Sequence, residues 1–590
     1  MASEQDEEIV MTPSKKGKAT HIRIERQKKK VLDLDEKVAH VGGGQNKGLV
    51  IQKQQDTDDV DAKPQVQLGF NCFLVDQKTG QHVVESRKLK FWYVETADYL
   101  DQVTTAFNFF RELLKPENFP KDYVGFIKKC MKLMQKIEYK MARKIYLEVK
   151  QLEEDEAPMS PDSYNMRNFK DLFETGLVKH DTRPQEEIIR ERLLQVLESA
   201  YPNILAVEDL VRIVQAEESM VLQQLTELKQ RELVREMETG GFVRRVLDDK
   251  TEVQEVKQMP TIAANQQPTI AIITANYYEK VAVDAMMQDK TTFVRFKTGG
   301  ESHVYTIGFI GEHKVVSTKL PAIGHHRAAQ ISAGNTTTRL LGTFQNIEHV
   351  LIVGVAGGMP HYTDYFKHVR LGDVVISTCN KDGKLYYYCD KILQDKDGKI
   401  TYHSKSWGPK DQFLQQVVKK MKDATLSKKK FAPWEKYIQD GLELLSSQEA
   451  DFNRPPPGTD RLTMSIGDGN VIEVQHPDCP DEAQQDRKAG MPKIHFGVYG
   501  SGKTIAKEYD VRLDFAGRYD LVAIDSEFDQ VLESIHGNRK DSYIFIRGVS
   551  DYSDGSRNKE WLPYAALAAA AVTKSIIKSF ANPHMSEDEL

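Results

Sequence analysis

The stretch Tyr519–Asp554 constrains the fold more than any other part of the chain. It holds two apolar runs, Leu521–Ile524 and Tyr543–Ile546. Acidic residues follow each run, Asp525 and Glu527 after the first, Asp551 and Asp554 after the second. Short apolar runs separated by a helix-length segment are typical of the strands of a βαβ unit. Because ligands bind beyond the carboxyl ends of such strands, these carboxylates are candidates for acid or base chemistry.

The same pattern recurs throughout residues 268–582. Further strands are predicted over Thr269–Ile273, His349–Val353, Val374–Ser377 and Lys493–Tyr499. Glycines follow two of these strands, as Gly354–Gly358 and as Gly500 and Gly502, and glycine allows a backbone to approach a ligand closely. The sequence therefore predicts an α/β domain with a site at its strand ends.

The composition excludes several classes of protein. The chain has 590 residues, 40% apolar and 28% charged, with a net charge of −6, so it has no bulk attraction to nucleic acid or anionic membrane. That length suits roughly three to five domains. Five scattered cysteines suit free thiols in a reducing compartment, so we expect an intracellular protein, cytoplasmic or nuclear. No apolar run reaches ~18 residues, so no membrane span is expected.

Six stretches carry a family resemblance. They are TIAIITANYYEKVAV, HVLIVGVAGGMP, VRLGDVVIST, IHFGVYGSGKTI, DLVAIDSE and IFIRGVSDYSDGSRNKEWLPYAALAAAAVTKSI, in that order. Together they resemble the purine nucleoside phosphorylase and nucleosidase superfamily, and most of all its methylthioadenosine/adenosylhomocysteine nucleosidase branch. The resemblance covers residues 268–582 and implies a three-layer α/β domain that self-associates into a homo-oligomer.

The resemblance also implies a role for each acid. Glu279 falls where a carboxylate positions and deprotonates the attacking water, Glu527 where a glutamate holds the ribose hydroxyls, and Asp551 where an acid protonates the purine leaving group. The residues that it places around the substrate are Gly354, Val355, Ala356, Gly357, Ser501, Gly502, Ile505, Ala506, Asp525, Ser526 and Phe528.

The chemistry of the reaction asks for such a set. Cleavage of an N-glycosidic bond builds positive charge on the sugar and negative charge on the base. It needs an acid at the base, a carboxylate at the water and another at the 2′-hydroxyl. Plainer interpretations exist for two residues, since Glu279 can be a solvated charge at a helix start and Asp551 can form an Asx turn after a strand.

The nucleophile can be water or phosphate. The phosphorylase branch has an Arg and a Ser around the strand-end glycines, where this chain has the apolar Ile352 and Val355. Because this chain lacks those phosphate-binding side chains, water is favoured over phosphate as the nucleophile. Arg327, beside His325 and His326, is either a substitute cation for phosphate or part of a basic surface cluster. Phosphorolysis therefore stays open as an alternative.

Two departures from the family put activity in question. At the ribose strand the family's Glu-Met-Glu-Ala becomes Asp-Ser-Glu-Phe, so Ser526 replaces a Met that packs on the sugar and Phe528 replaces a small Ala. A catalytically degenerate, nucleoside-sensing protein is therefore the alternative to an enzyme. The insert Asp390–Gly490 is longer than a compact nucleosidase needs, and predicts a loop over the site or a contact surface.

Gly497–Thr504 (GVYGSGKT) also fits the Walker A pattern, in which backbone amides hold phosphates. Because it lies in the base-binding slot implied by the resemblance, a separate nucleotide triphosphatase is the weaker interpretation. A narrower hypothesis is that Lys503 contacts the phosphate of a nucleotide substrate.

The chain before residue 183 is less informative. Residues 1–66 are predicted to be disordered, and their basic stretch Lys15–Lys30 is either a solvated tail or a nuclear-import or nucleic-acid patch. Residues 67–180 form an unassigned α+β region. Its predicted elements are a hairpin over Phe70–Val75 and His82–Val94, and helices over Tyr99–Leu113 and Tyr123–Leu152.

Residues 183–250 look like a winged-helix domain. Helices are predicted over Pro184–Ala200, Val207–Val214 and Ser219–Arg231, followed by a hairpin at Gly240-Gly241. The span Arg183–Val246 holds 9 Lys/Arg against 12 Asp/Glu, so contact with a protein is favoured over contact with DNA. Residues 251–267 are predicted to be a linker.

The sequence thus predicts a multidomain protein with a disordered N-terminal tail, a small winged-helix-like α+β domain and a C-terminal nucleoside phosphorylase-like domain. The expected activity is cleavage of a purine nucleoside or nucleotide, by hydrolysis and without a cofactor. His476-Pro477-Asp478-Cys479 lacks partners at ligand spacing and is predicted to be a loop, so no metal is expected.

Overall fold

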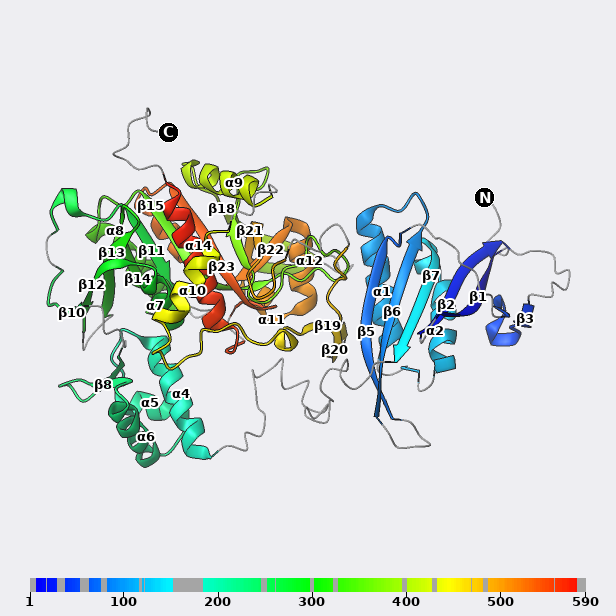
Figure 1. Ribbon diagram of the computed structural model, residues 1–590, viewed down its shortest axis with the longest axis horizontal. Coiled ribbons are helices and arrows are strands. Elements are labelled where there is room, and N and C mark those ends of the chain that lie inside the picture. Colours follow the sequence, from blue (N-terminus) through cyan, green and yellow to red (C-terminus); the bar gives the residue numbers. More distant parts are fainter. Residues whose placement is uncertain are drawn as a thin grey trace. The chain divides into compact units, whose positions relative to one another are not determined.

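The computed structural model describes most of the chain (Figure 1). The described residues are 7–16, 19–28, 38–53, 63–75, 82–115, 119–120, 123–151, 184–245, 252–259, 262–297, 302–321, 327–394, 400–426, 432–467, 470–480, 487–555 and 558–580. They belong to two compact units. The first comprises residues 1–179, 361–368 and 458–481, and the second comprises residues 180–360, 369–457 and 482–590.

The first unit is built on a nine-stranded sheet in the order β19-β20-β5-β6-β7-β2-β1-β4-β3. Its strands are β1 (Glu7–Lys16), β2 (Ala19–Lys28), β3 (Val38–Val41), β4 (Leu49–Gln52), β5 (Val66–Val75), β6 (His82–Tyr93), β7 (Ala142–Gln151), β19 (Leu462–Gly467) and β20 (Asn470–Val474). Two helices accompany them, α1 (Tyr99–Leu114) and α2 (Tyr123–Gln135). The last two strands come from within the predicted C-terminal domain, so that domain is not one contiguous unit.

Helix α1 shows how the local sequence places the core of this unit. The Asp98 side chain caps the helix by accepting from the backbone N–H of Asp101 at 2.8 Å. Ala106, Phe109, Phe110 and Leu113 are buried, at the spacing that lines one face of a helix. Their partners are alternate residues of the strands, among them Phe70 and Phe91, whose ring centroids lie 5.5 and 5.6 Å from those of Phe110 and Phe109.

Two predictions about the first unit were wrong. Residues 1–66 are not uniformly disordered, because their described parts include four strands. Alternate apolar residues such as Ile22 and Ile24 are buried there, and β2 pairs with β7. The predicted helix Tyr123–Leu152 is a helix only as far as Gln135. Its second half is β7, which lies between β6 and β2, so pairing on both sides overrides the helical pattern.

The winged-helix elements were predicted to within a residue or two. They are α4 (Gln185–Ala200), α5 (Val207–Val214), α6 (Glu218–Gln230), β8 (Val234–Glu236) and β9 (Phe242–Arg244). Leu193, Leu210 and Leu225, one from each helix, are fully buried in a common core. Gly240 has a φ of +79° at the tip of the β8–β9 hairpin, a conformation that favours glycine.

The second unit also contains a twelve-stranded mixed sheet. Its order is β10-β12-β13-β14-β11-β15-β23-β16-β21-β17-β18, with β22 pairing both β15 and β21. The strands are β10 (Glu252–Glu255), β11 (Ile270–Thr274), β12 (Gln288–Arg295), β13 (His303–Ile310), β14 (His313–Lys319), β15 (His349–Gly358), β16 (Val374–Ser377), β17 (Tyr386–Gln394), β18 (Ile400–Trp407), β21 (Ile494–Ser501), β22 (Leu521–Asp525) and β23 (Ser542–Asp551).

Helices pack on this sheet in groups. They are α7 (Tyr277–Ala285), α8 (Arg327–Thr343), α9 (Phe413–Leu426), α10 (Trp434–Leu444), α11 (Lys503–Lys507), α12 (Tyr509–Tyr519), α13 (Asp529–Gly537) and α14 (Leu562–Lys578). The buried α14 contacts α7, α10 and the central strands β15 and β23 (Figure 1), while α8 packs with α13. No helix among the described residues is long and apolar enough to cross a membrane.

Two further predictions need correction here. The predicted linker 251–267 contributes β10, which pairs in parallel with β12 at the sheet edge. The insert Asp390–Gly490 was predicted to be a loop over the site or a contact surface, and it is not a single loop. Part of it forms β18, α9 and α10 of the second unit, and residues 458–481 join the first unit, where β20 pairs with β5.

Candidate functional site

The strand ends named by the sequence meet at one edge of the second sheet. Strands β11, β15 and β23 run parallel, and β22 crosses the end of β15 in the antiparallel sense. Gly357 pairs with Asp551 of β23 and with Ile524 of β22. The residues that follow β11, β22 and β23 therefore approach the end of β15.

Glu279 lies in the first turn of α7, immediately after β11, and is 2% exposed. Its carboxylate completes a capping box, accepting from the backbone N–H of Ala275 at 2.6 Å and of Asn276 at 3.0 Å through Oε2. Oε1 accepts from Val355 N at 2.8 Å. The side chain therefore points toward the end of β15, and not into solvent as the plainer interpretation predicted.

Arg547 is a site residue that sequence reasoning missed. It is fully buried in β23, and its Nε donates to Asp525 Oδ2 at 2.7 Å. Its Nη1 lies 3.9 Å from Glu279 Oε1. Neither Nη1 nor Nη2 has a hydrogen-bond partner among the described residues. The available signal was an arginine in the middle of the apolar strand IFIRGVSD, because such residues are almost never buried unpaired.

The Arg547 guanidinium joins two acids that the sequence placed far apart. Burial raises the pKa of the Asp525 carboxyl to about 7, and Arg547 opposes that rise. Although burial lowers the pKa of Arg547, Asp525 and Glu279 raise it above its usual value. The guanidinium also lies over the Phe528 ring at 4.4 Å. Phe528, which the resemblance places around the substrate, is therefore buried against Arg547.

Gly354 provides the space for this arrangement. It pairs with Arg547 across the β15–β23 ladder. A Cβ at this position would lie 2.2 Å from Glu279 Cδ and 2.5 Å from Arg547 Nη1, well inside contact distance. The stretch Gly354–Gly358, predicted to follow the strand, is in fact the last part of β15, because β22 and β23 pair with it from either side.

Glu527 and Asp551 are also buried, at 3% and 7% exposure. Gln330 of α8 donates to Glu527 Oε2. Asp551 Oδ1 accepts from the backbone N–H groups of Ser553 at 2.7 Å and Gly555 at 2.9 Å. Asp551 therefore forms the Asx-type turn of its plainer interpretation, which fixes its position at the end of β23. Among the described contacts, none joins Glu279 directly to Glu527 or Asp551.

Tyr386 of β17 organises several of the predicted substrate contacts. Its hydroxyl lies 2.7 Å from Ser501 Oγ, donates to Ser526 O at 2.8 Å and accepts from Phe528 N at 3.0 Å. Ser501 is the last residue of β21 and pairs with Asp525. The sequence gave no signal for this tyrosine, because its role depends on three segments that meet only in the fold.

The remaining wall residues follow Ser501. Ile505 and Ala506 are buried in α11. Ala506 O accepts from Ser553 Oγ at 3.1 Å, which joins this wall to the turn at Asp551. A Cβ on Gly502, whose φ is +145°, would lie 2.7 Å from Cys389 O, so this position needs a glycine.

The Walker A interpretation is wrong, because β21 extends to Ser501 and holds Gly497 and Gly500 in a strand, so that only Gly502 lies between this strand and α11. A Cβ on Gly497 would lie 2.1 Å from the Val522 side chain, so close packing explains that glycine. Lys503, the proposed phosphate contact, is exposed at the start of α11. Arg327 begins α8, and its side chain lies outside the described residues, as do His325 and His326. Val355 and Ala356 are buried in β15 beside Ile352.

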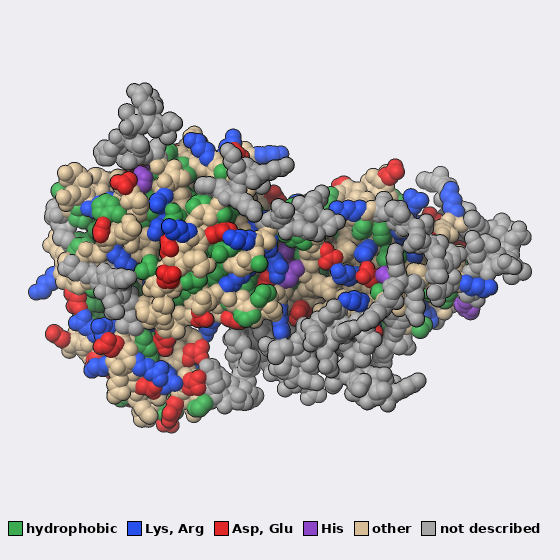
Figure 2. Space-filling view, viewed as in Figure 1, with side chains coloured by type: hydrophobic (Ala, Val, Ile, Leu, Met, Phe, Trp, Pro, Cys, Tyr) green, Lys and Arg blue, Asp and Glu red, His purple; other side chains and the backbone are tan. Residues whose placement is uncertain are grey.

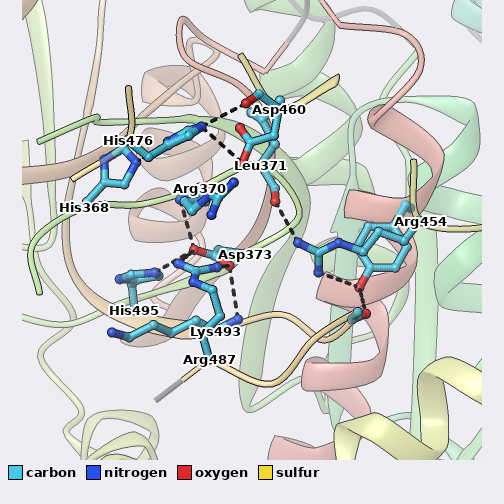
Figure 3. Close-up of polar contacts among 12 residues, drawn as sticks. His368, Arg370, Leu371, Asp373, Arg454, Asp460, His476, Arg487, Lys493 and His495 are labelled. Atoms are coloured by element: carbon cyan, nitrogen blue, oxygen red, sulfur yellow. Dashed lines mark hydrogen bonds and ion pairs between the residues drawn. The ribbon is translucent and has the colours of Figure 1, made fainter. Parts of the chain in front are cut away.

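The segment Leu371-Gly372-Asp373, which precedes β16, anchors the end of β23 (Figure 3). Asp373 accepts from Arg487 Nη2 at 2.7 Å and lies 2.9 Å from His495 Nε2. Although burial raises its pKa, Arg487 and His495 lower the pKa of Asp373 well below its usual range. The Asp373 backbone carbonyl accepts from Val549 N at 2.8 Å, two residues before Asp551. This network therefore holds the strand that delivers Asp551.

The described residues contain no group of His, Cys, Asp and Glu side chains that could hold a metal ion. The fragment His476–Cys479 belongs to the first unit. There His476 Nδ1 lies 2.8 Å from His368 Nε2 (Figure 3). Asp478 pairs with Lys88 at 3.0 Å. These contacts explain the fragment as a structural loop, as predicted.

The winged-helix surface carries little unpaired positive charge. Of the eight basic residues in 184–245, seven are ion-paired with carboxylates, namely Arg190, Arg212, Lys229, Arg231, Arg235, Arg244 and Arg245. Figure 2 shows the two signs of charge intermixed over α4–α6. DNA binding depends on neutralising phosphates, so this pairing disfavours it.

Comparisons with known proteins match parts of the chain. Residues 179–246 match the family model described as a winged helix-turn-helix domain. A nucleotide-binding leucine-rich repeat (NLR)-like protein of Hyaloscypha variabilis is 26% identical over 319 residues, which is 53% of this chain and 29% of that protein. The chain thus spans less than a third of this relative.

Solved structures of 5′-methylthioadenosine/S-adenosylhomocysteine nucleosidases are also similar to about half of the chain. The enzyme of Neisseria meningitidis is 16% identical, with a TM-score of 0.32, over 53% of this chain and 100% of its own. The S-adenosylhomocysteine nucleosidase of Streptococcus pyogenes is 13% identical, with a TM-score of 0.33, over 54% and 98%. At these identities and TM-scores, no residue role follows from the likeness.

Proposed function

We propose that residues 268–582 cleave the N-glycosidic bond of a purine nucleoside or nucleotide with water as the nucleophile. The observation that carries the proposal is the buried Glu279–Arg547–Asp525 cluster at the strand ends, beside which β22 and β23 deliver Glu527 and Asp551. Buried acids, and an arginine whose two Nη atoms make no hydrogen bond to the described residues, are expected at a site that handles charge, not in a core.

Glu279 is suited to hold and deprotonate the water. A carboxylate has about four acceptor positions, and three are taken by backbone N–H groups, two at Oε2 and one at Oε1. The remaining position at Oε1 lies on the atom nearest Arg547. A water held there would be fixed by a rigid acceptor, which is the geometric requirement for a general base.

The other two acids are suited to the two remaining roles, which are contact with the ribose hydroxyls and protonation of the base. Glu527 would hold the ribose hydroxyls, and Asp551 would protonate the departing base. The apolar, buried Ile352 and Val355 support water over phosphate, because a phosphate clamp needs cations or hydroxyl groups.

The test is to incubate the purified full chain with purine nucleosides and nucleotides, with and without phosphate, and to measure free base by chromatography. Release without phosphate is expected. Glu279→Gln, Glu527→Gln and Asp551→Asn should each reduce the rate by ~10²–10⁴-fold. Glu533→Gln, at an exposed carboxylate of α13, is the control and should leave the rate unchanged. Release only with phosphate would contradict the proposal.

A ligand sensor is the second candidate. It is favoured by the position of Phe528, whose ring covers Arg547 where the family carries a small residue. Calorimetry on the same compounds distinguishes the two candidates. Binding without release of base would establish the sensor and refute the enzyme.

A further inference from the structure

The winged-helix domain is joined to the second sheet by a buried ionic network. Arg244 of β9 and Glu198 of α4 are 3% and 5% exposed, and Arg244 Nε lies 3.2 Å from Glu198 Oε1. Arg244 Nη1 also donates to the carbonyls of Leu233 and Arg245 at 2.7 and 2.8 Å. These contacts of the pair all lie within the winged helix, which therefore presents the pair preassembled.

The partner of this pair is the turn that precedes Glu279. Tyr278 donates its hydroxyl to Glu198 Oε2 at 2.9 Å. Arg244 lies over the Tyr277 ring at 4.8 Å, and the Tyr201 ring packs edge-on against Tyr277 with 6.0 Å between centroids. Both tyrosines belong to the first turn of α7, directly before Glu279. The winged helix thus contacts the two residues that precede Glu279, the proposed base.

A second connection comes through Lys319 at the end of β14. Its Nζ donates to Ser199 O of the winged helix at 2.8 Å and to Leu320 O at 3.0 Å, and the side chain is 1% exposed. Burial lowers the pKa of Lys319 to about 7, while Glu279 and Glu198 raise it. Lys319 therefore lies within electrostatic reach of both the proposed base and the winged-helix acid.

Such a network is rigid only when complete. A buried charge left without its partner is strongly unfavourable, and buried polar networks fix one arrangement when every member is satisfied. Within the second sheet the Glu279 carboxylate is held to β15 by Val355 N, while the two tyrosines before it are held by the winged helix. Loss of the winged-helix contacts would therefore leave Glu279 fixed from one side only and let it shift. A misplacement of about 1 Å can cost on the order of 10²-fold in rate.

We propose that the winged-helix domain is a positioning element of the active site, in which Glu198 and Arg244 hold Tyr277 and Tyr278 so that Glu279 stays aligned with Arg547. This inference rests on the proposed function. It makes Glu198, Arg244 and Tyr278 positioning residues, and it makes turnover depend on whether the winged helix is seated on α7.

The experiment uses the full chain and three variants, Tyr278→Phe, Arg244→Met and the conservative Arg244→Lys. Base release should show kcat lowered by about 3- to 10-fold for Tyr278→Phe and by about 10- to 100-fold for Arg244→Met, with KM little changed, because the base acts on water and not on substrate binding. Arg244→Lys should recover part of the loss. Lys229→Gln, which breaks an exposed ion pair on the same domain, is the matched control.

Hydrogen exchange gives a readout that does not need catalysis. The amides of Ala275–Glu279 should exchange faster in Tyr278→Phe and Arg244→Met than in the wild type, while those of α5 and α6 stay protected, which shows that the module is folded. If these amides and kcat are both unchanged in the two variants, the inference is overturned. If the wild type releases no base, the proposed function fails, and the exchange result alone decides whether the winged helix holds the turn.

Discussion

Substituting Gly354 by alanine tests the geometry of the site at its most crowded point. The new Cβ would lie 2.2 Å from both Cδ and Oε1 of Glu279 and 2.5 Å from Arg547 Nη1. Neither the Glu279 carboxylate nor the Arg547 guanidinium can move without losing hydrogen bonds. Three backbone N–H groups hold the Glu279 carboxylate, and the guanidinium is hydrogen-bonded to Asp525.

The cost follows from these contacts. Overpacking a buried site costs about 1–3 kcal/mol, and losing one hydrogen bond to a charged group, here that of Val355 N, costs about 1.5–3 kcal/mol. We therefore expect Gly354→Ala to lower the free energy of unfolding by about 3–5 kcal/mol. Displacement of Glu279 should also reduce base release on the order of 10²-fold.

Urea unfolding followed by tryptophan fluorescence measures this change in the right part of the molecule. Three of the four tryptophans, Trp407, Trp434 and Trp561, are buried in the second unit. Gly342→Ala in α8 is the control, because a Cβ there meets nothing within 4 Å and should stabilise the helix by up to about 1 kcal/mol. If Gly354→Ala unfolds at the wild-type midpoint and keeps its turnover, the close approach of Glu279 to β15 is wrong.

Two further predictions concern pH. The folded pKa of Asp525, about 7, lies above its unfolded value. As pH drops below about 7, the Asp525 carboxylate that holds Arg547 becomes protonated, so turnover should fall. By the same linkage, the contribution of Asp525 to the free energy of unfolding falls as pH rises from about 4 to 7. Asp525→Asn should abolish both the pH dependence of the rate and this pH dependence of unfolding. Arg487→Met should destabilise the second unit by about 3–5 kcal/mol at pH 7, since it strands the buried Asp373 charge. The pKa of Asp373 is depressed in the fold, so the stability that its ion pair contributes is present above about pH 4 and lost below it. The urea midpoints of the variant and the wild type should therefore converge below about pH 4. Equal midpoints at pH 7 would contradict the argument.

Elements decided by short-range pattern were predicted well. The bounds of α5 and β16 match the prediction, and those of α1 differ by one residue. The winged helix was found in the same way, because its helices each carry an apolar face and its hairpin carries paired glycines. Two strands whose place depends on distant partners were missed. The alternating stretch that forms β7 is a strand because β6 and β2 flank it, and β20 joins β5 across almost four hundred residues of sequence.

For the site, the sequence by itself determined which acids follow which strands, because strand ends and their flanking residues are local features. It placed Glu279, Glu527 and Asp551 at strand ends, and the structure finds all three buried there. Only the tertiary structure decided what surrounds them. Arg547 links Glu279 to Asp525, and the winged helix reaches the turn before Glu279, through contacts between segments distant in the chain. No local pattern encodes such contacts, because side-chain packing and burial select the partners only after the strands have paired.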